Sequence, residues 1–557
     1  MSNVLSAISA SSAVALIAVS LALSSAAGLR VSARGSAVPA DVQPYDWTTD
    51  GGDNQRTGWN KAERTLTKDN VRNLKLLWKI DTGNEPRALH GLMPVLVIGR
   101  LNTASGPKQV GIISGISDNL YAFDVESGSM LWRRHWTYDA PVGRGGGGFG
   151  PPGNAPTDPR RIGFLRPGGS SDVGVIGPAD AQGRRPVYFV TGDGMLHTIN
   201  AADGEDLQPA FMLHEGKGWA LNLVGRTIWM ANTYASSSIA AVNLDDSQHH
   251  VMSYNAGSGG AWGRRGAAFD STGTAWLTTG DGVYDPASDP PKYGNSVIGV
   301  HMVGEDLKLK DYYTPTNWDW LRRRDLDPNN TPTIFTYKGR ELIAASGKEC
   351  RMYLLDPKSA GGANHQTPLY KSALFCNEEV DFQDAGSWGA LSTWEDADGT
   401  RWVLAPFWGP VHSQFKFEVS HGPVKDGGVA GFKLREKNGE YSLTPAWVSR
   451  DMKRGEPVVI ANGMVFGFGS GVETKQSWPD IGLQFDSSIR AGKSGHATIF
   501  VLDAQNGKTL WDSGEDIKSF THFSGITVAN GRVYLGTYDG MLYCFGLERA
   551  SRPTEER

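Results

Sequence analysis

Five side chains between residues 262 and 388 could do chemistry if the fold brings them together: Trp262, Asp281, Asp319, Lys348 and Trp388. An aspartate can take the proton of a hydroxyl group, and carboxylate oxygens are the ligands that calcium-type ions prefer. A lysine ammonium can contact carbonyl oxygens, and a tryptophan offers a flat face to an aromatic ligand. These residue types therefore allow proton transfer, cation binding and aromatic stacking.

Ordinary structural roles would also account for these residues singly. Trp262 is one of 18 tryptophans, and a protein core uses many of these. Asp319 stands just before Arg322-Arg323-Arg324, with which it could form surface ion pairs. The functional interpretation therefore depends on the order and spacing of the whole set.

Signatures of several other enzyme classes are missing from the sequence. The 12 histidines form no HExxH pattern, and no Gly-x-Ser-x-Gly elbow is present. The three cysteines, Cys350, Cys376 and Cys544, form no CxxCH, so no covalently attached haem is expected. Cys350 and Cys376 are expected either to form one disulfide or to remain two buried thiols.

The composition predicts an all-β protein. There are 70 glycines and 29 prolines but also 18 tryptophans, a mixture that suits many short strands joined by tight turns. The formal net charge is −5, and basic and acidic residues are interspersed along the chain. This charge pattern argues against a nucleic-acid partner.

One phrase recurs along the chain: an alternating apolar strand, a turn rich in Asp, Asn and Gly, and then Leu-Trp. The clearest copies are residues 120–132 (LYAFDVESGSMLW) and 499–511 (IFVLDAQNGKTLW). Weaker copies begin near the following residues: Leu196, Ile239, Val297, Met352, Val429 and Leu542. The recurrence of one phrase eight times along the chain indicates a repeat architecture.

The repeat predicts an eight-bladed β-propeller of four-stranded antiparallel blades, with eight blades favoured over seven. Each copy is a hairpin whose Gly or Asn supplies a positive φ, and the Trp that follows can lie flat between neighbouring blades. One blade cannot bury both of its faces alone, so the blades stack into a closed ring. Residues 74–78 (LKLLW) are predicted to close the ring beside the last blade, whose own phrase lacks Leu-Trp.

These phrases resemble the tryptophan-docking repeats of the pyrroloquinoline-quinone (PQQ) dehydrogenase superfamily and its non-enzymatic relatives. The opening passage strengthens the resemblance with residues 46–54 (DWTTDGGDN) and 66–78 (LTKDNVRNLKLLW). The resemblance covers nearly all of the chain after the first thirty residues. It is specific for the fold and much less specific for an activity.

In the enzymes of that family, PQQ lies flat in the central funnel, stacked on a tryptophan and beside a calcium or lanthanide ion and an aspartate base. The resemblance implies that Trp262, Lys348 and Trp388 bind the cofactor, with Lys348 on the carbonyl oxygens of the quinone. It also implies that Asp281 and Asp319 bind the metal ion and that Asp319 is the catalytic base.

Two departures from the family pattern count against an active enzyme. This chain has no adjacent cysteines, whereas the enzymes usually carry a disulfide of adjacent cysteines over the quinone. Residues 231–238 (ANTYASSS) offer no carboxylate where the enzymes carry a metal-binding Glu. Two functions therefore remain. One is a quinoprotein-like dehydrogenase that oxidises an alcohol or sugar hydroxyl and passes electrons to a separate carrier. The other is a non-catalytic propeller that binds a protein partner, like the family's outer-membrane assembly relatives.

The two ends of the chain differ from the rest. Residues 14–23 (VALIAVSLAL) are apolar and small residues follow them, which predicts a signal peptide over residues 1–27 and a periplasmic or secreted protein. Because no Lys or Arg precedes the apolar run, an uncleaved anchor is the alternative. We expect a flexible linker over 28–44, a single propeller over 45–548 without a membrane span, and a disordered tail over 549–557.

Overall fold

The computed structural model describes residues 44–87, 89–138, 172–214, 217–233, 237–378, 385–473, 475 and 487–548. The predicted signal peptide, nearly all of the predicted linker and the predicted tail lie outside these residues. No helix among the described residues is long and apolar enough to cross a bilayer.

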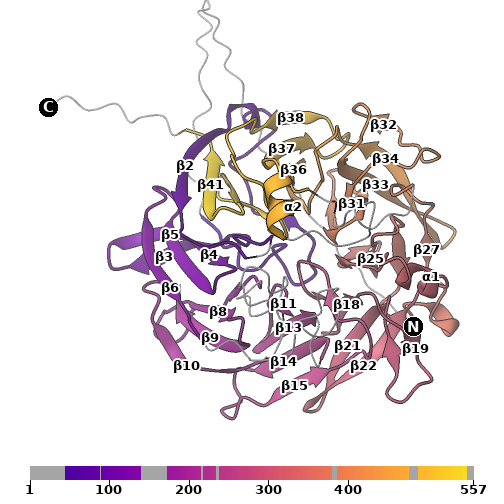
Figure 1. Cartoon of the computed structure of the whole chain (residues 1–557), viewed down its shortest axis with the longest axis horizontal. Helices are drawn as coiled ribbons and strands as arrows, with labels where there is room; N and C mark the ends of the chain where they lie inside the picture. The colour runs from indigo at the N-terminus through magenta and orange to yellow at the C-terminus, as the bar shows by residue number, and fades with distance from the viewer. Residues whose placement is uncertain are drawn as a thin grey trace, which may run out of the picture. The chain divides into compact units, whose positions relative to one another are not determined.

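The described strands form eight antiparallel blades that follow one another around a ring, as Figure 1 shows. The predicted fold class, an eight-bladed propeller of mostly four-stranded blades, is confirmed. Each of the eight recurring phrases forms the third strand of one blade: β5, β9, β14, β21, β26, β33, β37 and β41, whose bounds follow.

The first four blades are built as follows: β3 (Leu96–Thr103), β4 (Gly106–Gly115), β5 (Asn119–Asp124) and β6 (Met130–His135); β7 (Val175–Ile176), β8 (Pro186–Val190), β9 (Met195–Asn200) and β10 (Asp206–Met212); β11 (Lys217–Gly218), β12 (Asn222–Val224), β13 (Thr227–Thr233), β14 (Ile239–Asn243) and β15 (Val251–Tyr254); β16 (Ala261–Trp262), β17 (Ala268–Phe269), β18 (Ala275–Thr279), β21 (Val297–Val303) and β22 (Asp306–Tyr313).

The last four blades are these: β24 (Thr333–Tyr337), β25 (Arg340–Ala345), β26 (Tyr353–Leu355) and β27 (Tyr370–Lys371); β28 (Gly386–Ser387), β30 (Ser392–Glu395), β31 (Arg401–Trp408), β32 (Val419–Ser420), β33 (Gly427–Lys437) and β34 (Glu440–Val448); β1 (Trp59–Asn60), β35 (Val459–Ala461), β36 (Met464–Gly469), β37 (Thr498–Asp503) and β38 (Thr509–Asp512); β39 (Ile526–Ala529), β40 (Arg532–Gly536), β41 (Met541–Gly546) and β2 (Lys75–Asp81).

Short elements connect the blades. Two pairs of short strands stand apart from the blades: β19 (Tyr284–Asp285) with β20 (Lys292–Tyr293), and β23 (Asn330–Thr331) with β29 (Gly389–Ala390). The helical turns are η1 (Val71–Asn73), α1 (Trp318–Arg322), η2 (Gly362–Asn364) and α2 (Ser487–Lys493).

The ring closes between the two ends of the propeller, as the sequence predicts. Strand β2 pairs antiparallel with β41 over the register Lys75↔Gly546 to Asp81↔Met541. The outer strand of the last blade therefore comes from the start of the chain, and the two strands lie side by side in Figure 1. This pairing removes the exposed edge that the last blade would otherwise present.

Tryptophans dock neighbouring blades onto one another at three junctions. The indole Nε1 of the buried Trp447 donates a hydrogen bond to the Ala504 carbonyl oxygen (3.1 Å), and Gly507 of the same turn lies against the ring. Two other blade junctions repeat this arrangement: Trp78 with Val125 and Gly128, and Trp132 with Ala201 and Gly204. The glycine of the Asp-x-x-x-Gly turn is required both for its positive φ and because the neighbouring indole occupies the space of a side chain.

A single segment, residues 47–60, contacts the inner edge of every blade. The hydrogen bonds, in blade order, are Trp47 N to Val97 O (2.8 Å), Ile176 N to Thr48 O (2.9 Å), Asn54 Nδ2 to Leu223 O (2.9 Å), Phe269 N to Asn54 O (2.7 Å), Ile334 N to Gln55 O (3.0 Å), Thr393 N to Thr57 O (2.8 Å), Ile460 N to Gly58 O (2.7 Å) and Asn60 Nδ2 to Val528 O (2.6 Å). Because these contacts come from all eight blades, the segment runs around the hub of the propeller.

Buried charges fill the hub at the level of this segment. The Asp50 carboxylate pairs with Arg264 (2.7 Å) and lies 3.7 Å from the Arg265 guanidinium. Arg265 continues across the hub to the carbonyl oxygen of Val458 (2.8 Å). Burial alone would raise the pKa of Asp50, but the surrounding guanidinium groups outweigh it and lower the pKa, so the carboxylate is ionised. Asp50, Arg56, Arg264 and Arg265 are named here the ionic plug.

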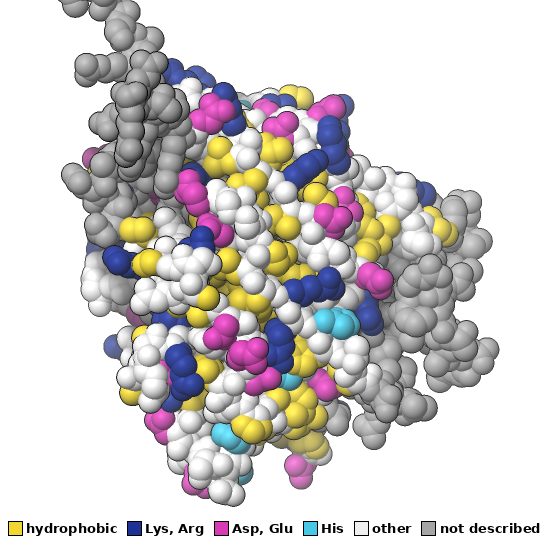
Figure 2. Space-filling model, turned by 90° about the vertical axis from the view of Figure 1, so that its left-hand side faces the viewer, with side chains coloured by type: hydrophobic (Ala, Val, Ile, Leu, Met, Phe, Trp, Pro, Cys, Tyr) yellow, Lys and Arg dark blue, Asp and Glu magenta, His cyan; other side chains and the backbone are white. Residues whose placement is uncertain are grey.

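The outer surface carries charges of both signs. On the face that Figure 2 shows, Lys and Arg side chains are interspersed with Asp and Glu. Ion pairs such as Lys338–Glu436 (2.8 Å) and Arg134–Asp206 (2.9 Å) bridge neighbouring blades. Exposed pairs of this kind contribute little stability, so the tryptophan docking and the hub hold the ring together.

We expect Gly507→Ala to destabilise the propeller more than Gly439→Ala. Both glycines have a positive φ, +76° and +83°, and alanine in this conformation costs roughly 1–2 kcal/mol. Only at Gly507 would the new Cβ also lie 2.4 Å from Trp447 Cε3, whereas Gly439 has open space around it. The clash adds about 1–3 kcal/mol, measurable by denaturant unfolding. Equal losses in the two variants would contradict tryptophan docking at this junction.

Candidate active site at the hub

The predicted site residues lie on connections that meet at one end of the ring. Lys348 is in the turn between β25 and β26, and Asp281 follows β18. Trp262 ends β16, and Trp388 lies between β28 and β29. In a propeller, turns that follow the second strand and connections that enter the first strand lie at the same end, so these side chains can converge.

Lys348 is the centre of the charged group. Its Nζ lies 2.6 Å from Asp325 Oδ1 and 2.7 Å from Asp327 Oδ1. The Lys348 side chain is 8% exposed, Asp327 2% and Asp325 24%, so Asp325 is the more accessible of the two carboxylates that contact Lys348. Nζ also stands 5.0 Å from the centre of the Trp388 ring, at cation–π distance.

The electrostatics of this group follow from burial and from its neighbours. Burial alone would lower the pKa of Lys348, but the Asp327 and Asp325 carboxylates outweigh it and raise the pKa. Burial raises the pKa of Asp327, an effect that Lys348 opposes. Partial desolvation and the nearby Asp325 carboxylate raise the pKa of Asp281 to about 6. Asp281, Asp325, Asp327 and Lys348 therefore form one interacting cluster, named here the charge cluster.

A chain of aromatic rings adjoins the charge cluster. It runs from Trp388 to Trp408 (4.8 Å between ring centres), His522 (6.4 Å), Phe523 (4.0 Å), Trp219 (6.0 Å) and Trp262 (5.6 Å). These six residues are named here the aromatic collar. Trp388, the first member, lies beside Lys348. Trp262, the last member, lies beside Asp327: a Cβ placed on Gly280 would be 2.1 Å from Trp262 and 3.1 Å from Asp327.

The collar lies at the centre of the ring. Trp219 enters the third blade and Phe523 enters the eighth, yet their rings are in contact. Trp408 of the sixth blade likewise approaches His522, which leads into the eighth. Residues from blades that are not neighbours can meet only at the hub. Trp262 and Phe523 are partly exposed, so a flat ligand has ring faces to contact.

Of the predicted site residues, the structure brings Trp262, Asp281, Lys348 and Trp388 together, but not Asp319. Asp319 lies on α1 with its side chain 38% exposed, and it pairs with Arg322 (3.0 Å) and Arg323 (2.5 Å). These two ion pairs lower its pKa. The carboxylates that act on Lys348 are those of Asp325 and Asp327 instead.

Asp325 and Asp327 were missed by the sequence analysis. They flank the buried Leu326 in an Asp-Leu-Asp sequence six residues after Asp319. Asp325 is a turn residue with a positive φ (+53°), so no strand or helix periodicity marks the two carboxylates as a pair. Only the structure shows that both face Lys348.

Several buried polar atoms around the charge cluster have no hydrogen-bond partner among the described residues. They are Asn295 Oδ1, Asn329 Oδ1, Asn330 Oδ1, Ser346 Oγ and Trp388 Nε1. All five belong to the connections that carry Asp281, Asp327, Lys348 and the collar. Buried polar groups are normally satisfied by protein, ordered water or a ligand, so water or a polar ligand can supply the partners of these five atoms.

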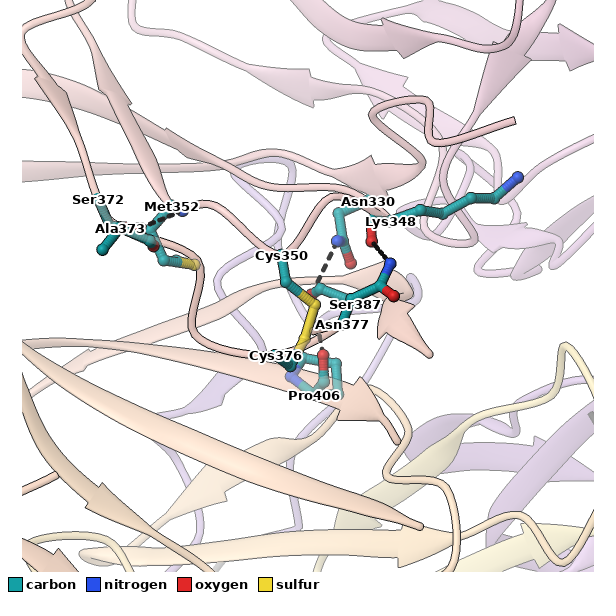
Figure 3. The surroundings of a disulfide bond; sticks show 10 residues. All are labelled: Asn330, Lys348, Cys350, Met352, Ser372, Ala373, Cys376, Asn377, Ser387 and Pro406. Carbon is teal, nitrogen blue, oxygen red and sulfur yellow. Dashed lines mark hydrogen bonds between the residues drawn. A yellow bond between two sulfur atoms is a disulfide. The ribbon is translucent and has the colours of Figure 1, made fainter. Parts of the chain in front are cut away.

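A disulfide joins Cys350 to Cys376, which settles the alternative that the sequence left open. The bond lies directly beside the Lys348 turn, and Figure 3 shows the Lys348 side chain running away from the sulfur atoms. Asn377, next to Cys376, donates a hydrogen bond to the Lys348 carbonyl oxygen (2.7 Å). The third cysteine, Cys544, is buried and free.

Glu456 connects the collar with the ionic plug. Burial raises its pKa to about 8, although Arg264 and a hydrogen bond with Trp408 act in the opposite direction. The side chain is 5% exposed and is therefore mostly protonated at neutral pH. Because Glu456 is neutral, Trp408 can pack against it without a second buried negative charge next to the plug.

Comparisons with known proteins agree with the fold. No family model and no curated protein matches the sequence. A europium-containing methanol dehydrogenase is 13% identical with a TM-score of 0.55, and the match covers 90% of this chain and 98% of that one. The quinohemoprotein alcohol dehydrogenase ADHIIG from Pseudomonas putida HK5 is 12% identical with a TM-score of 0.52, covering 92% and 82%.

A third match is BamB from Moraxella catarrhalis, with 12% identity, a TM-score of 0.33 and coverage of 86% and 99%; at this score the match carries no argument. The two dehydrogenase matches, at their low identity, concern the fold alone. The predicted propeller fold is confirmed at that level.

We expect Glu456→Gln to remove one component of the pH dependence of stability. The pKa of Glu456 is raised from 4.5 in the unfolded chain to about 8, so its contribution is complete below about 4.5 and is lost as the pH rises towards 8. The melting temperature of the variant minus that of the wild type should therefore increase across this window and level off above it. Parallel curves for the two proteins would show that Glu456 is not held in its neutral form.

Proposed function

We propose that this chain is a quinoprotein-like oxidoreductase that binds PQQ in the hub, oxidises an alcohol or sugar hydroxyl and passes the electrons to a separate carrier. The observation that carries the proposal is the buried Lys348 ammonium, held between two carboxylates at the edge of the aromatic collar. A hydroxyl oxidation requires a base and a nearby positive charge, and both are present here. Trp262 and Trp388 would contact the flat cofactor, and Lys348 its carbonyl oxygens.

Asp325 is the base that the geometry favours. It is the most accessible carboxylate in contact with Lys348, and Asp327 lies behind it in the interior. A base must come within hydrogen-bonding distance of the hydroxyl proton, which favours the accessible carboxylate. Bound PQQ would supply the two-electron acceptor. Asp319, the base implied by the resemblance, is held by two arginines on the surface helix.

A calcium or lanthanide ion, which the resemblance also implies, does not fit these residues as they stand. Such an ion takes six to eight oxygen ligands. The described part of the chain contains no group of three or more Asp, Glu, His or Cys side chains arranged to hold a metal. Lys348 lies between Asp325 and Asp327, and Asp319 is engaged elsewhere. No step of the proposed reaction is therefore assigned to a metal ion.

Export from the cytoplasm is part of the proposal. The Cys350–Cys376 disulfide supports it, because such bonds persist mainly in oxidising compartments. A periplasmic or secreted enzyme would find its electron carrier outside the cytoplasm. A propeller that binds a protein partner is the alternative that remains if the quinone does not bind.

We expect PQQ to raise the melting temperature of the purified protein. A ligand that binds only the folded state at a hundred times its Kd adds about 2.7 kcal/mol of stability. Lys348→Met should weaken this effect, whereas Lys308→Met, at an exposed lysine on the rim of the fourth blade, should not. An unchanged melting temperature with PQQ, with or without added calcium or lanthanum, would contradict the proposal.

Dye-linked turnover distinguishes the two assignments of the base. We expect Asp325→Asn to lower kcat by about 10²–10⁴-fold while sparing most of the PQQ affinity, since an amide cannot take the proton. Asp306→Asn, at an exposed aspartate of the blade rim, is the matched control. If Asp319→Asn abolishes turnover and Asp325→Asn does not, the base is Asp319 and the assignment from geometry is wrong.

A further inference from the structure

The Lys348 ammonium occupies a position of the kind that a bound metal ion would take. Two carboxylate oxygens from the same short segment approach Nζ at 2.6 and 2.7 Å, and Asp281 lies close enough for Lys348 to affect its pKa. Two carboxylates held this close repel one another unless a cation lies between them. In this chain the cation is part of the protein.

The backbone holds the ammonium in this place. The Lys348 amide donates a hydrogen bond to the Asp327 carbonyl oxygen (3.1 Å), which ties the turn to the segment that carries both aspartates. Asn377 Nδ2 donates to the Lys348 carbonyl oxygen (2.7 Å). Cys350 N donates to Gly347 O (2.9 Å), and the disulfide fixes this end of the turn to Cys376 (Figure 3). These contacts fix the backbone from which the Lys348 side chain extends, and the two carboxylates hold its Nζ.

The surrounding charges make a second cation unnecessary. Arg322 opposes the rise in the pKa of Asp281, so positive groups adjoin the charge cluster from two elements, α1 and the turn after β25. A divalent ion would have to displace the buried lysine, which would then lose both of its carboxylate partners.

We propose that Lys348 is the resident cation of the hub, taking the place of a metal ion between Asp325 and Asp327, so that the site binds its ligand without a divalent or trivalent ion. The inference rests on the charge cluster alone and holds whether or not the ligand is PQQ. It predicts that removal of the ammonium charge turns the same carboxylates into a metal site.

The test uses Tb³⁺, Ca²⁺ and La³⁺ on the chelator-treated full-length protein, with no quinone present. Trp388 and Trp262 lie close enough to sensitise Tb³⁺ emission from an ion between the aspartates. For the wild type we expect no Tb³⁺ emission that the Asp325→Asn substitution abolishes. We also expect no shift of the wild-type melting temperature with Ca²⁺ or La³⁺. Lys348→Met should gain both signals, reversibly with EDTA, and lose them again when combined with Asp325→Asn.

Lys348→Arg is the matched control, since it keeps a cation in place and should bind no ion. The proposal is overturned if the wild type binds Tb³⁺ in a manner that Asp325→Asn abolishes, or if a folded Lys348→Met protein binds none. Should Lys348→Met fail to fold, Lys348→Gln takes its place, and the wild-type result alone can still overturn the proposal. Because no quinone is used, failure of the PQQ titration and failure of this test are separate outcomes.

Discussion

The interaction on which the rest of the structure depends is the hydrogen bonding of residues 47–60 to the inner edges of all eight blades. A propeller blade otherwise contacts only its two neighbours, so its inner strands have nothing to set their common distance from the axis. Here one segment sets that distance for the whole ring. The ionic plug completes the arrangement: Asp50 of this segment lies against Arg264 and Arg265 of the fourth blade, and Arg265 also donates to the Val458 carbonyl oxygen.

The candidate site is built directly on this plug. Trp262 of the aromatic collar is followed within three residues by Arg264 and Arg265 of the plug. At the opposite side of the hub, Gly525 is two residues after Phe523 of the collar. A Cβ on Gly525 would lie 2.7 Å from the Arg264 guanidinium, so this part of the chain also borders the plug. The collar therefore takes its position from the plug. The charge cluster is fixed at the edge of the collar by the Lys348 turn, with its disulfide and its bond to the Asp327 backbone. A rigid site of this kind favours a rigid, flat ligand, because little entropy is lost on binding.

The sequence predicts the fold well because the clearest repeats carry their own docking chemistry. The Asp-x-x-x-Gly-x-x-Leu-Trp phrase specifies a hairpin and supplies the indole that the next blade's glycine accepts, so the third strand of every blade could be located from the sequence. The ring closure through β2 also follows, because the last copy has no tryptophan of its own.

The site is only partly predictable, because its residues meet through the closure of the ring. Trp262, Asp281, Lys348 and Trp388 were expected from their order along the chain and do converge. The base was placed on Asp319, although Arg322 and Arg323 stand at the three- and four-residue spacing that favours ion pairs on a helix. Trp219, Phe523 and His522 join the collar from distant blades, and no local pattern marks them.

The central claim is that the hub presents one preformed site in which an aromatic collar ends at a lysine held by two aspartates. An experimental structure of the protein with PQQ, prepared in the presence of a metal chelator, tests this claim most directly. The account predicts the cofactor against Trp262 and Trp388, with a carbonyl oxygen within hydrogen-bonding distance of Lys348 Nζ and no ion between Asp325 and Asp327. Density for the cofactor on the outer surface, or Lys348 turned out of the hub, would contradict it.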